Sequence, residues 1–370
     1  MRKKFKAARR IVLKAGTSIL TSPKGNFSRK AFSRLGRGIL SLLRERREVV
    51  LVSSGAIALG METLRLKSRP AELKKLQACA AIGQGKLMHA YEEFFSKHRI
   101  HTAQILLTRD GLETKERFLT AKHTLDELFK MGILPVVNEN DTVATEEIAF
   151  GDNDFLSVWV AHLIHADLLI LLSDVDGFYL AGGSRVRTVE DSKQIEKTLV
   201  AHVQDKRKEK TVGGMKAKLQ AARIAMRLGV PLVIVSGHEE KIIQRTLVGE
   251  DVGTIFCASN SQKNARKKWI AFSAARKGAV VVDAGACEAL RTKKRSLLPS
   301  GLVKIQGSFE RGAIIELETL EGKVFGRGQV RYSSQELGQI AGKKTHEIQA
   351  VLGYKCPDEV IHRNDLVLWS

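Results

Sequence analysis

Over about its first 255 residues, the chain alternates short runs rich in β-branched residues with longer amphipathic stretches. The runs expected to form strands are "RIVLKAG", "EVVLVSSG", "IHTAQILLT", "GILPVVNEN", "ADLLILLSD" and "GVPLVIVSG". One expected helix begins after Ser28, a residue suited to the N-cap, and continues to Arg47; another begins after Pro70. Because strands joined through helices need crossover connections, the sequence predicts an α/β fold with a mostly parallel sheet sandwiched by helices.

The pattern changes near residue 262. The stretch "CASNSQKNARKKWIAF" is polar and basic and suits a linker. Runs such as "GAVVVDAGACEAL" and "GLVKIQGSFERGAIIEL" then indicate short strands separated by glycine turns. We therefore expect two domains, residues 1–262 with the linker and a small β-rich, barrel-like domain at residues 263–370.

The formal net charge of +21 is spread over the chain. Residues 263–370 hold 19 Lys and Arg against 11 Asp and Glu, and the preceding residues hold 42 against 29. Anionic nucleotides and RNA would both suit such a protein. No apolar run approaches the ~20 residues of a membrane helix, and the basic start leads directly into an expected strand, so we predict a cytoplasmic protein. The four cysteines form no C-x-x-C pair, which argues against a zinc site or a disulfide framework.

Several polar motifs follow the expected strands, whose carboxyl ends form the ligand crevice of such sheets. Lys14 in "VLKAGTSIL" could bring a positive charge to phosphate oxygens. In "TVGGMKAKLQ", Lys216 and Lys218 fall in the first turn of a helix whose N-terminus attracts anions. The motifs "SSG", "END" and "GDND" look built for a small polar ligand. Each motif alone also fits a structural role, such as a strand-end lysine, a surface loop or, for Asp154, a helix cap.

Taken in order, these pieces resemble the amino-acid kinase family from about residue 10 to residue 256. The motifs are "KAGTS", "LVSSGAIALG", "AAIGQGKL", "LLTRDGLETKERFLTAKHTL", "VVNENDTVATEEI", "FGDNDFLS", "LLSDVDGFY" and "GGMKAKLQAA". The tail, with "SLLPSGLVKIQGSFERG" and "GRGQVRYSS", is similar to a PUA domain, a module also present in RNA-modifying enzymes. Within the family, the chain most resembles members that phosphorylate L-glutamate. The resemblance implies ATP-dependent transfer to the γ-carboxylate, yielding L-glutamyl 5-phosphate for proline biosynthesis, with Mg²⁺ bridging the ATP phosphates.

The same resemblance implies roles for individual residues. Lys14 and Lys218 would supply positive charge from opposite ends of the transferring phosphoryl group, and Asp154 would orient them. Glutamate would be held by Ser54, Asp141 and Asn153, with Asp141 on its ammonium group and Asn153 on its α-carboxylate or the neighbouring loop. Nucleotide contacts would come from Lys14, Ser173, Asp174, Val212, Gly213, Gly214, Met215, Lys216, Ala217 and Lys218. No metal ligand is assigned.

The chain departs from the family pattern in its nucleotide motifs. Ser173 stands where threonine is usual, and residues 212–215 replace a Thr-Gly-Gly-Met loop, which affects the expected adenine and ribose contacts. Family members bind proline as a feedback inhibitor near the glutamate site, and the sequence leaves this open for the present chain. A homo-oligomer is expected, with no membrane partner. RNA binding through the tail is the alternative activity, and the kinase interpretation does not require it.

Overall fold

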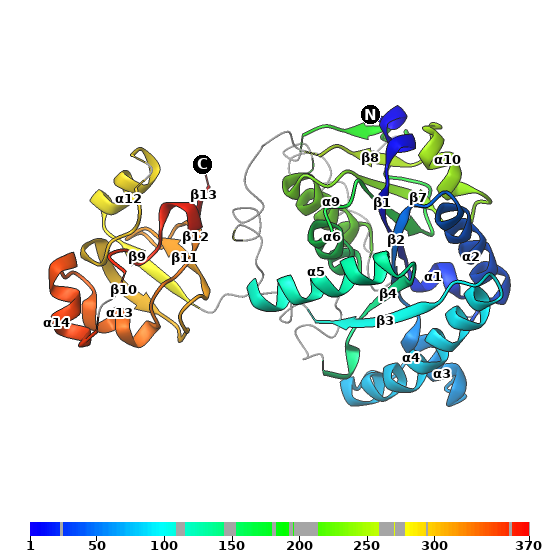
Figure 1. The fold of residues 1–370 in the computed structure, drawn as a ribbon, viewed down its shortest axis with the longest axis horizontal. Coiled ribbons are helices and arrows are strands. Elements are labelled where there is room, and N and C mark those ends of the chain that lie inside the picture. Colours follow the sequence, from blue (N-terminus) through cyan, green and yellow to red (C-terminus); the bar gives the residue numbers. More distant parts are fainter. Residues whose placement is uncertain are drawn as a thin grey trace. The chain divides into compact units, whose positions relative to one another are not determined.

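The structure is a computed structural model that describes residues 1–22, 25–108, 115–143, 153–179, 183–191, 195, 214–258, 270, 278–293, 295–354 and 357–369. The chain divides into two compact units. The first is formed by most of residues 1–261 and contains the larger sheet, and the second is formed mainly by residues 262–370 (Figure 1).

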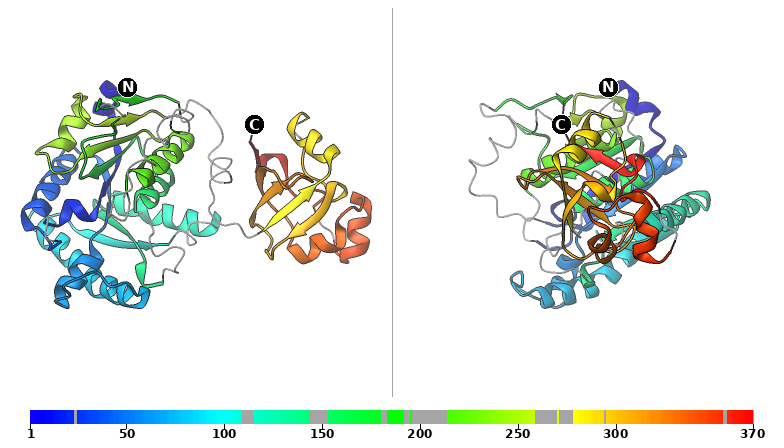
Figure 2. Two further views of the ribbon diagram at one scale, coloured as in Figure 1. Left: turned by 180° about the vertical axis from the view of Figure 1, so that it is seen from behind. Right: turned by 90° about the vertical axis from the view of Figure 1, so that its left-hand side faces the viewer.

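The first unit is built on an eight-stranded sheet, counted over the described residues, in the order β3-β4-β2-β1-β5-β7-β8-β6. Figure 2 shows the ribbon from two further directions. Its strands are β1 (Arg10–Ala15), β2 (Glu48–Ser53), β3 (Thr102–Leu107), β4 (Leu134–Glu139), β5 (Leu168–Ser173), β6 (Thr188–Val189), β7 (Leu232–Ser236) and β8 (Thr254–Phe256). Neighbouring strands pair in parallel except β7 and β8, which are antiparallel. The predicted mostly parallel sheet is confirmed, and β1 lies at its centre between β2 and β5.

Helices cover both faces of this sheet. They are α1 (Thr17–Leu20), α2 (Arg29–Arg44), α3 (Ala56–Thr63), α4 (Leu73–Ser96), α5 (Lys115–Lys130), α6 (Asn153–Leu163), α9 (Met215–Leu228) and α10 (Ile242–Val248). Figure 1 shows α6 and α9 on one side of β1 and α2 and α10 on the other, and each pair is in contact. In the part of the chain that the structure describes, no helix is both long and apolar enough to cross a membrane.

The predicted N-cap of α2 is present, but the predicted end of this helix is wrong. The Ser28 hydroxyl accepts a hydrogen bond from the backbone N–H of Ala31 at 3.3 Å, as an N-cap residue does. The helix ends at Arg44, three residues before the expected Arg47. Arg46 has a φ of 58°, a left-handed conformation that cannot continue a right-handed helix, so the chain turns there into β2.

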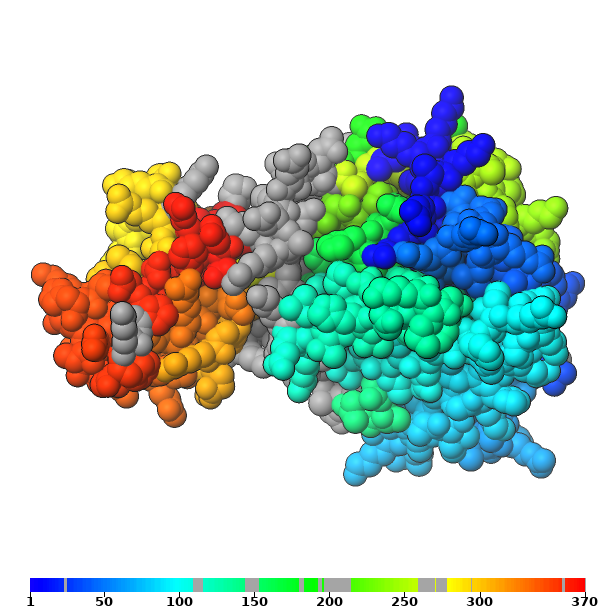
Figure 3. All heavy atoms as spheres, viewed as in Figure 1, coloured from blue at the N-terminus to red at the C-terminus, as the bar shows by residue number. Residues whose placement is uncertain are grey.

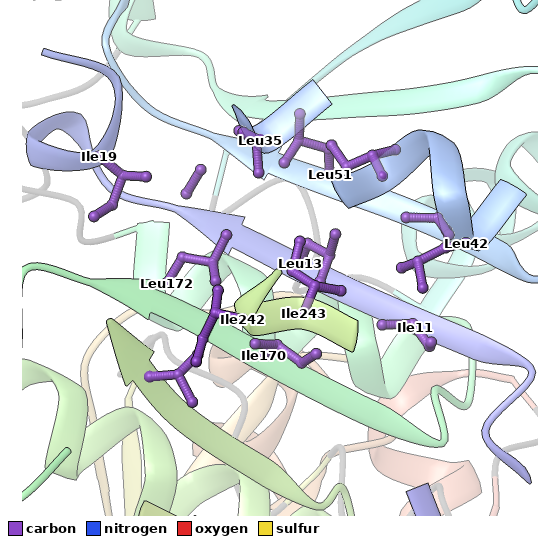
Figure 4. Close-up of a cluster of buried hydrophobic side chains, with 14 of the residues drawn as sticks. Ile11, Leu13, Ile19, Leu35, Leu42, Leu51, Ile170, Leu172, Ile242 and Ile243 are labelled. Atoms are coloured by element: carbon purple, nitrogen blue, oxygen red, sulfur yellow. The ribbon is translucent and has the colours of Figure 1, made fainter. Parts of the chain in front are cut away.

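The alternation of side chains along β1 decides what each face of the sheet carries. Ile11 and Leu13 belong to a buried hydrophobic cluster that also contains Leu35 of α2 and Ile243 of α10 (Figure 4). Since successive side chains of a strand point to opposite faces, Lys14 points to the side of α6 and α9. The central strand therefore brings one lysine toward those two helices.

The N-terminal residues form a short 3₁₀ helix, η1 (Arg2–Ala7), that packs against α10. The Arg2 guanidinium donates hydrogen bonds to the carbonyls of Glu250 at 2.8 Å and Val252 at 2.6 Å, and it pairs with Asp251 at 3.0 Å. The segment lies at the surface of the molecule, where Figure 3 shows it in dark blue. This basic start is therefore part of the folded first unit.

The second unit is a small five-stranded sheet with helices, counted over its described residues. The sheet order is β10-β9-β11-β12-β13, and its strands are β9 (Ala279–Val282), β10 (Leu302–Gln306), β11 (Ile314–Glu318), β12 (Val324–Gln329) and β13 (Leu366–Leu368). Its helices are α12 (Ala284–Arg291), α13 (Ser334–Ile340) and α14 (Ile348–Leu352). A separate hydrophobic core, including Leu317 and Tyr332, stabilises it. The expectation of a β-rich tail is confirmed.

Candidate active site

Lys14, Asp154 and Lys218 meet at the carboxyl end of β1. Lys14 is the penultimate residue of β1, Asp154 lies in the first turn of α6, and Lys218 lies in the first turns of α9. Lys14 Nζ is 2.6 Å from Asp154 Oδ1, and Lys218 Nζ is 3.4 Å from Asp154 Oδ2. The three residues predicted to act together are thus brought together by the central strand and the two helices on one face.

The Asp154 carboxylate is held in its charged form by the two lysines. It is fully buried, and burial alone would raise its pKa, but the Lys14 and Lys218 ammonium groups lower the pKa below its ordinary value. Lys14 is itself only 6% exposed. A buried carboxylate therefore holds two ammonium groups at a defined separation, and the three side chains together carry a net positive charge.

The expectation that Asp154 could cap α6 is wrong. The helix begins at Asn153, so Asp154 already lies inside its first turn, and its carboxylate is directed to the lysines. A carboxylate in the first turn is also favoured by the helix dipole, which is positive at this end. The preceding Gly151 and Asp152 lie outside the described residues.

The entry to α9 carries the predicted phosphate-binding segment. Gly214 is the N-cap residue of α9, without a side-chain cap, and Met215, Lys216 and Ala217 form the first turn. The Lys216 side chain is exposed, whereas the side chain of Lys218 is only 12% exposed and faces Asp154. Of the residues expected here, Val212 and Gly213 lie outside the described residues.

Ser173 and Asp174 follow the neighbouring strand β5. Ser173 is 2% exposed, and its hydroxyl donates a hydrogen bond to Asp174 Oδ1 at 3.0 Å. The Ser173 carbonyl accepts the N–H of Gly237 at 2.8 Å, which ties the ends of β5 and β7 together. The Asp174 side chain is exposed at the same edge of the sheet as the lysines. Its role as a nucleotide contact stays a prediction.

A polar cluster of amide and hydroxyl groups lies beside the lysines. Asn153 Nδ2 is within hydrogen-bond distance of the Ser53 carbonyl (3.0 Å), Ser54 Oγ (2.9 Å) and Asn138 Oδ1 (2.9 Å). The Ser53 hydroxyl contacts the hydroxyl of the buried Tyr91 at 2.8 Å, and burial raises the pKa of Tyr91. Asn153 therefore joins the ends of β2 and β4 to α6, and two of the predicted glutamate-binding residues, Asn153 and Ser54, are in direct contact.

Asp141 begins the short 3₁₀ helix η3 (Asp141–Val143), which is separated from β4 by Asn140. Burial raises the pKa of Asp141, and the positive charge of Arg69 opposes this shift. Because burial disfavours the charged form of this carboxylate, a cationic group of a ligand would stabilise it. The 3₁₀ helix η3 packs against α4.

Sequence reasoning missed two residues of this cluster, Asn138 and Gln84. Asn138 is 2% exposed in β4, and its Nδ2 donates to Gln84 Oε1 at 2.8 Å. Gln84 lies in α4 beside Gly83, at which a Cβ would come within 1.8 Å of the Ala56 carbonyl of α3. This close approach of two helices carries Gln84 to the strand ends. The signals available were an amide at a strand end in "VVNEND" and a glutamine between two glycines in "AIGQGKL".

The described residues hold no group of three or more His, Cys, Asp or Glu side chains arranged to bind a metal ion. Mg²⁺ commonly binds proteins through one or two carboxylates together with substrate phosphates. The exposed Asp174 at the carboxyl edge is a donor of the right kind, and the Asp154 carboxylate is occupied by two lysines. The residues present therefore fit a Mg²⁺ ion that arrives bound to a nucleotide.

A mostly parallel sheet with two lysines gathered on one buried carboxylate at its carboxyl edge defines an anion-binding α/β protein. The chain belongs to the amino acid kinase family, whose model matches residues 9–236. A PUA domain model matches residues 278–352. The fold of the larger unit is also similar to that of carbamate kinase from Giardia lamblia bound to AMP-PNP, with a TM-score of 0.50 at 17% identity over 69% of this chain and 100% of that one.

Curated relatives extend the similarity over the whole chain. A protein named glutamate 5-kinase from Myxococcus xanthus is 45% identical, covering 98% of this chain and 97% of its own. One of the same name from Carboxydothermus hydrogenoformans is 45% identical over 100% of both chains. A third, from Moorella thermoacetica, is 42% identical and covers 98% of this chain and 96% of its own. The kinase and PUA segments therefore occur together in these relatives.

Proposed function

We propose that the protein is a glutamate 5-kinase, which transfers the γ-phosphoryl group of ATP to the γ-carboxylate of L-glutamate and forms L-glutamyl 5-phosphate, the first step of proline biosynthesis. The single observation that carries the proposal is the Lys14–Asp154–Lys218 arrangement beside the Asn153 cluster. The names of relatives that match the whole chain support the same activity.

The two lysines would act by reducing the repulsion between two anions. A γ-carboxylate oxygen forms a new bond to the γ-phosphorus while the bond from phosphorus to the β,γ-bridging oxygen breaks, and ADP leaves. A glutamate carboxyl group has a pKa of about 4.3 and is ionised near neutral pH, so no general base is needed. Lys14 and Lys218 would stabilise the charge on the transferring group, and Asp154 would hold both ammonium groups in place.

The glutamate molecule would extend from the lysines to the polar cluster. Asn153 and Asp154 are consecutive residues in the first turn of α6, with one side chain in the amide cluster and the other on the lysines. Asp141 would pair with the substrate ammonium group, and Ser54 would contact the substrate beside Asn153. The γ-carboxylate would then be directed toward the ATP phosphates.

The nucleotide would lie over the ends of β5 and β7. We assign its contacts to Ser173, Asp174 and the 212–218 segment, in which Lys216 is exposed and the N-terminus of α9 has no side-chain cap at Gly214. Mg²⁺ bound with ATP would neutralise part of the phosphate charge.

The proposal includes further partners that the family resemblance suggests. Proline shares the α-ammonium and α-carboxylate groups of glutamate, so we include proline as a feedback inhibitor at the same polar cluster. We also include a homo-oligomer in the cytoplasm. RNA binding by residues 263–370 is a side activity that catalysis would not require.

The test is an assay of ADP formation by the full-length protein with Mg²⁺ and ATP. L-glutamate should support turnover, whereas L-aspartate, uridylate and N-acetyl-L-glutamate should support little. Hydroxylamine should trap the acyl phosphate as a hydroxamate, which identifies the carboxylate as the acceptor. Faster turnover with any of the other three acceptors would overturn the proposal.

A further inference from the structure

A chain of amide groups in the polar cluster has its orientation determined at one end by the backbone. The N–H of Glu139 can only donate, and it donates to Asn138 Oδ1 at 2.9 Å. The Asn138 oxygen therefore faces this N–H, and the Asn138 nitrogen donates to Gln84 Oε1 at 2.8 Å. It follows that Gln84 uses its oxygen inside the protein and keeps its Nε2 hydrogens available.

The other branch of this series of hydrogen bonds, at Asn153, leaves an acceptor available instead of a donor. Asn153 Nδ2 donates toward Asn138 Oδ1 at 2.9 Å and toward the Ser53 carbonyl at 3.0 Å, and both oxygens can only accept. The Asn153 side chain thus uses its nitrogen inside the protein and keeps its oxygen available. Among the described residues, neither Gln84 Nε2 nor Asn153 Oδ1 has a hydrogen-bond partner, although both atoms are buried.

A buried donor and a buried acceptor without partners are each unfavourable, and a ligand that offers the matching groups relieves both. An α-amino acid offers a carboxylate that only accepts and an ammonium group that only donates. We propose that Gln84, which is 9% exposed, is a specificity-determining residue that donates to the α-carboxylate of the substrate, while Asn153 Oδ1 accepts from its ammonium group. This inference rests on the proposed function, and it reverses the expected role of Asn153 as a ligand of the α-carboxylate.

Two observations place Gln84 within reach of the substrate. Gly83 of α4 lies close to the backbone of Ala56, the first residue of α3, and Ala56 is two residues after Ser54. Through Asn138, Gln84 is also connected to Asn153, whose Nδ2 contacts Ser54 Oγ at 2.9 Å. Gln84, Asn138, Asn153 and Ser54 thus form one continuous hydrogen-bonded group.

The experiment compares L-glutamate with its α-amide, L-isoglutamine, as phosphoryl acceptors. The α-amide keeps the γ-carboxylate and replaces the α-carboxylate with a carboxamide that can donate. The wild-type protein should prefer glutamate in kcat/KM. Gln84→Met removes the donor at similar length and should reduce this preference at least about tenfold, because a hydrogen bond to a charged group is lost. Gln84→Glu keeps the oxygen that Asn138 uses and should reverse the preference.

Gln104→Glu is the matched control, because it introduces the same charge on an exposed position of β3 and should leave the preference unchanged. The ratio of the kcat/KM values for L-glutamate and L-isoglutamine separates substrate recognition from a loss of stability, since unfolding lowers both values equally. If both Gln84 variants keep the wild-type preference, the inference is wrong. If the wild type shows no turnover with glutamate, the proposed function fails, and the melting-temperature increase with each amino acid still tests the preference of Gln84.

Discussion

Lys14 Nζ lies 2.6 Å from Asp154 Oδ1, and both side chains are buried. The carboxylate also holds Lys218 through its second oxygen, at 3.4 Å. One negative charge therefore stabilises two positive charges that would otherwise repel each other. These three side chains together carry a net positive charge, which suits an anionic ligand.

Asp154→Asn should destabilise the ligand-free protein, because it leaves two ammonium groups without their shared counter-charge. Removing one partner of a buried ion pair typically costs about 3–5 kcal/mol. Mg²⁺ and ATP should raise the melting temperature of this variant more than that of the wild type, since phosphate replaces the lost negative charge. Turnover should fall while the glutamate KM changes less. Thermal melts with and without ATP, together with steady-state kinetics, measure these effects, and equal ATP stabilisation of both proteins would contradict the argument.

Lys14→Ala should lower kcat by about 10²–10³, as expected when one preorganised charge is removed from a transition state. The physical reason is the position of Lys14 at the end of β1, 6% exposed and directed toward α6 and α9. Lys75→Ala is the control, because the Lys75 side chain is 65% exposed and is not part of the candidate site. A correctly folded Lys14→Ala protein with wild-type turnover would exclude a role in phosphoryl transfer.

Asp141→Asn should weaken glutamate binding and stabilise the ligand-free protein near neutral pH. Losing a charge-assisted contact to the ammonium group should raise the glutamate KM roughly 10–100-fold. Because the pKa of Asp141 is raised by burial, its ionised form is destabilising above the folded-state pKa, and this penalty disappears as the pH falls through that pKa. The difference in melting temperature between variant and wild type should therefore shrink on acidification. A variant that is less stable than the wild type at neutral pH would refute this account.

Residues 1–262 should retain glutamate-dependent ATP turnover without the tail. Every described residue of the candidate site lies in the first unit, which has its own hydrophobic core. The measurement compares kcat and KM of the truncated and full-length proteins after circular dichroism has shown that both are folded. Loss of activity in a folded truncated protein would mean that the tail contributes to assembly or to the site.

Glu336→Gln should lower the stability of the second unit at neutral pH, and this effect should become smaller in acid. Glu336 caps α13 together with Ser333, and its hydrogen bonds with Arg311 lower its pKa to about 2 from an ordinary 4.5. A lowered pKa contributes stability that is present above pH 4.5 and is lost as the pH falls toward 2. Glutamine at this position can keep the capping-box hydrogen bond, so the substitution removes mainly the partly exposed ion pair with Arg311, a loss of about 0.2–1 kcal/mol. Calorimetry of the full chain from pH 7 to pH 3 tests this, with the exposed Glu321→Gln as control.

The sequence by itself determined the fold class and most of the residues worth testing. Strand runs separated by long amphipathic helices leave little alternative to a mostly parallel sheet, and polar residues after each strand must then share its carboxyl edge. The N-cap of α2 was also readable, because a Ser28 hydroxyl before a helix acts through local geometry. The end of α2 was not readable, since it depends on the left-handed turn at Arg46.

Only the tertiary structure decided how these residues meet. The order β2-β1-β5 places β1 at the centre, and alternation along β1 sends Ile11 and Leu13 to α2 and α10 and Lys14 to α6 and α9. Whether Asp154 caps a helix or binds two lysines depends on this packing, which no local pattern encodes. Gln84 enters the site only because Gly83 lets α4 approach α3, a contact between residues 27 positions apart in the chain. Long-range packing of this kind brings separate motifs into one site, and a sequence read segment by segment does not contain it.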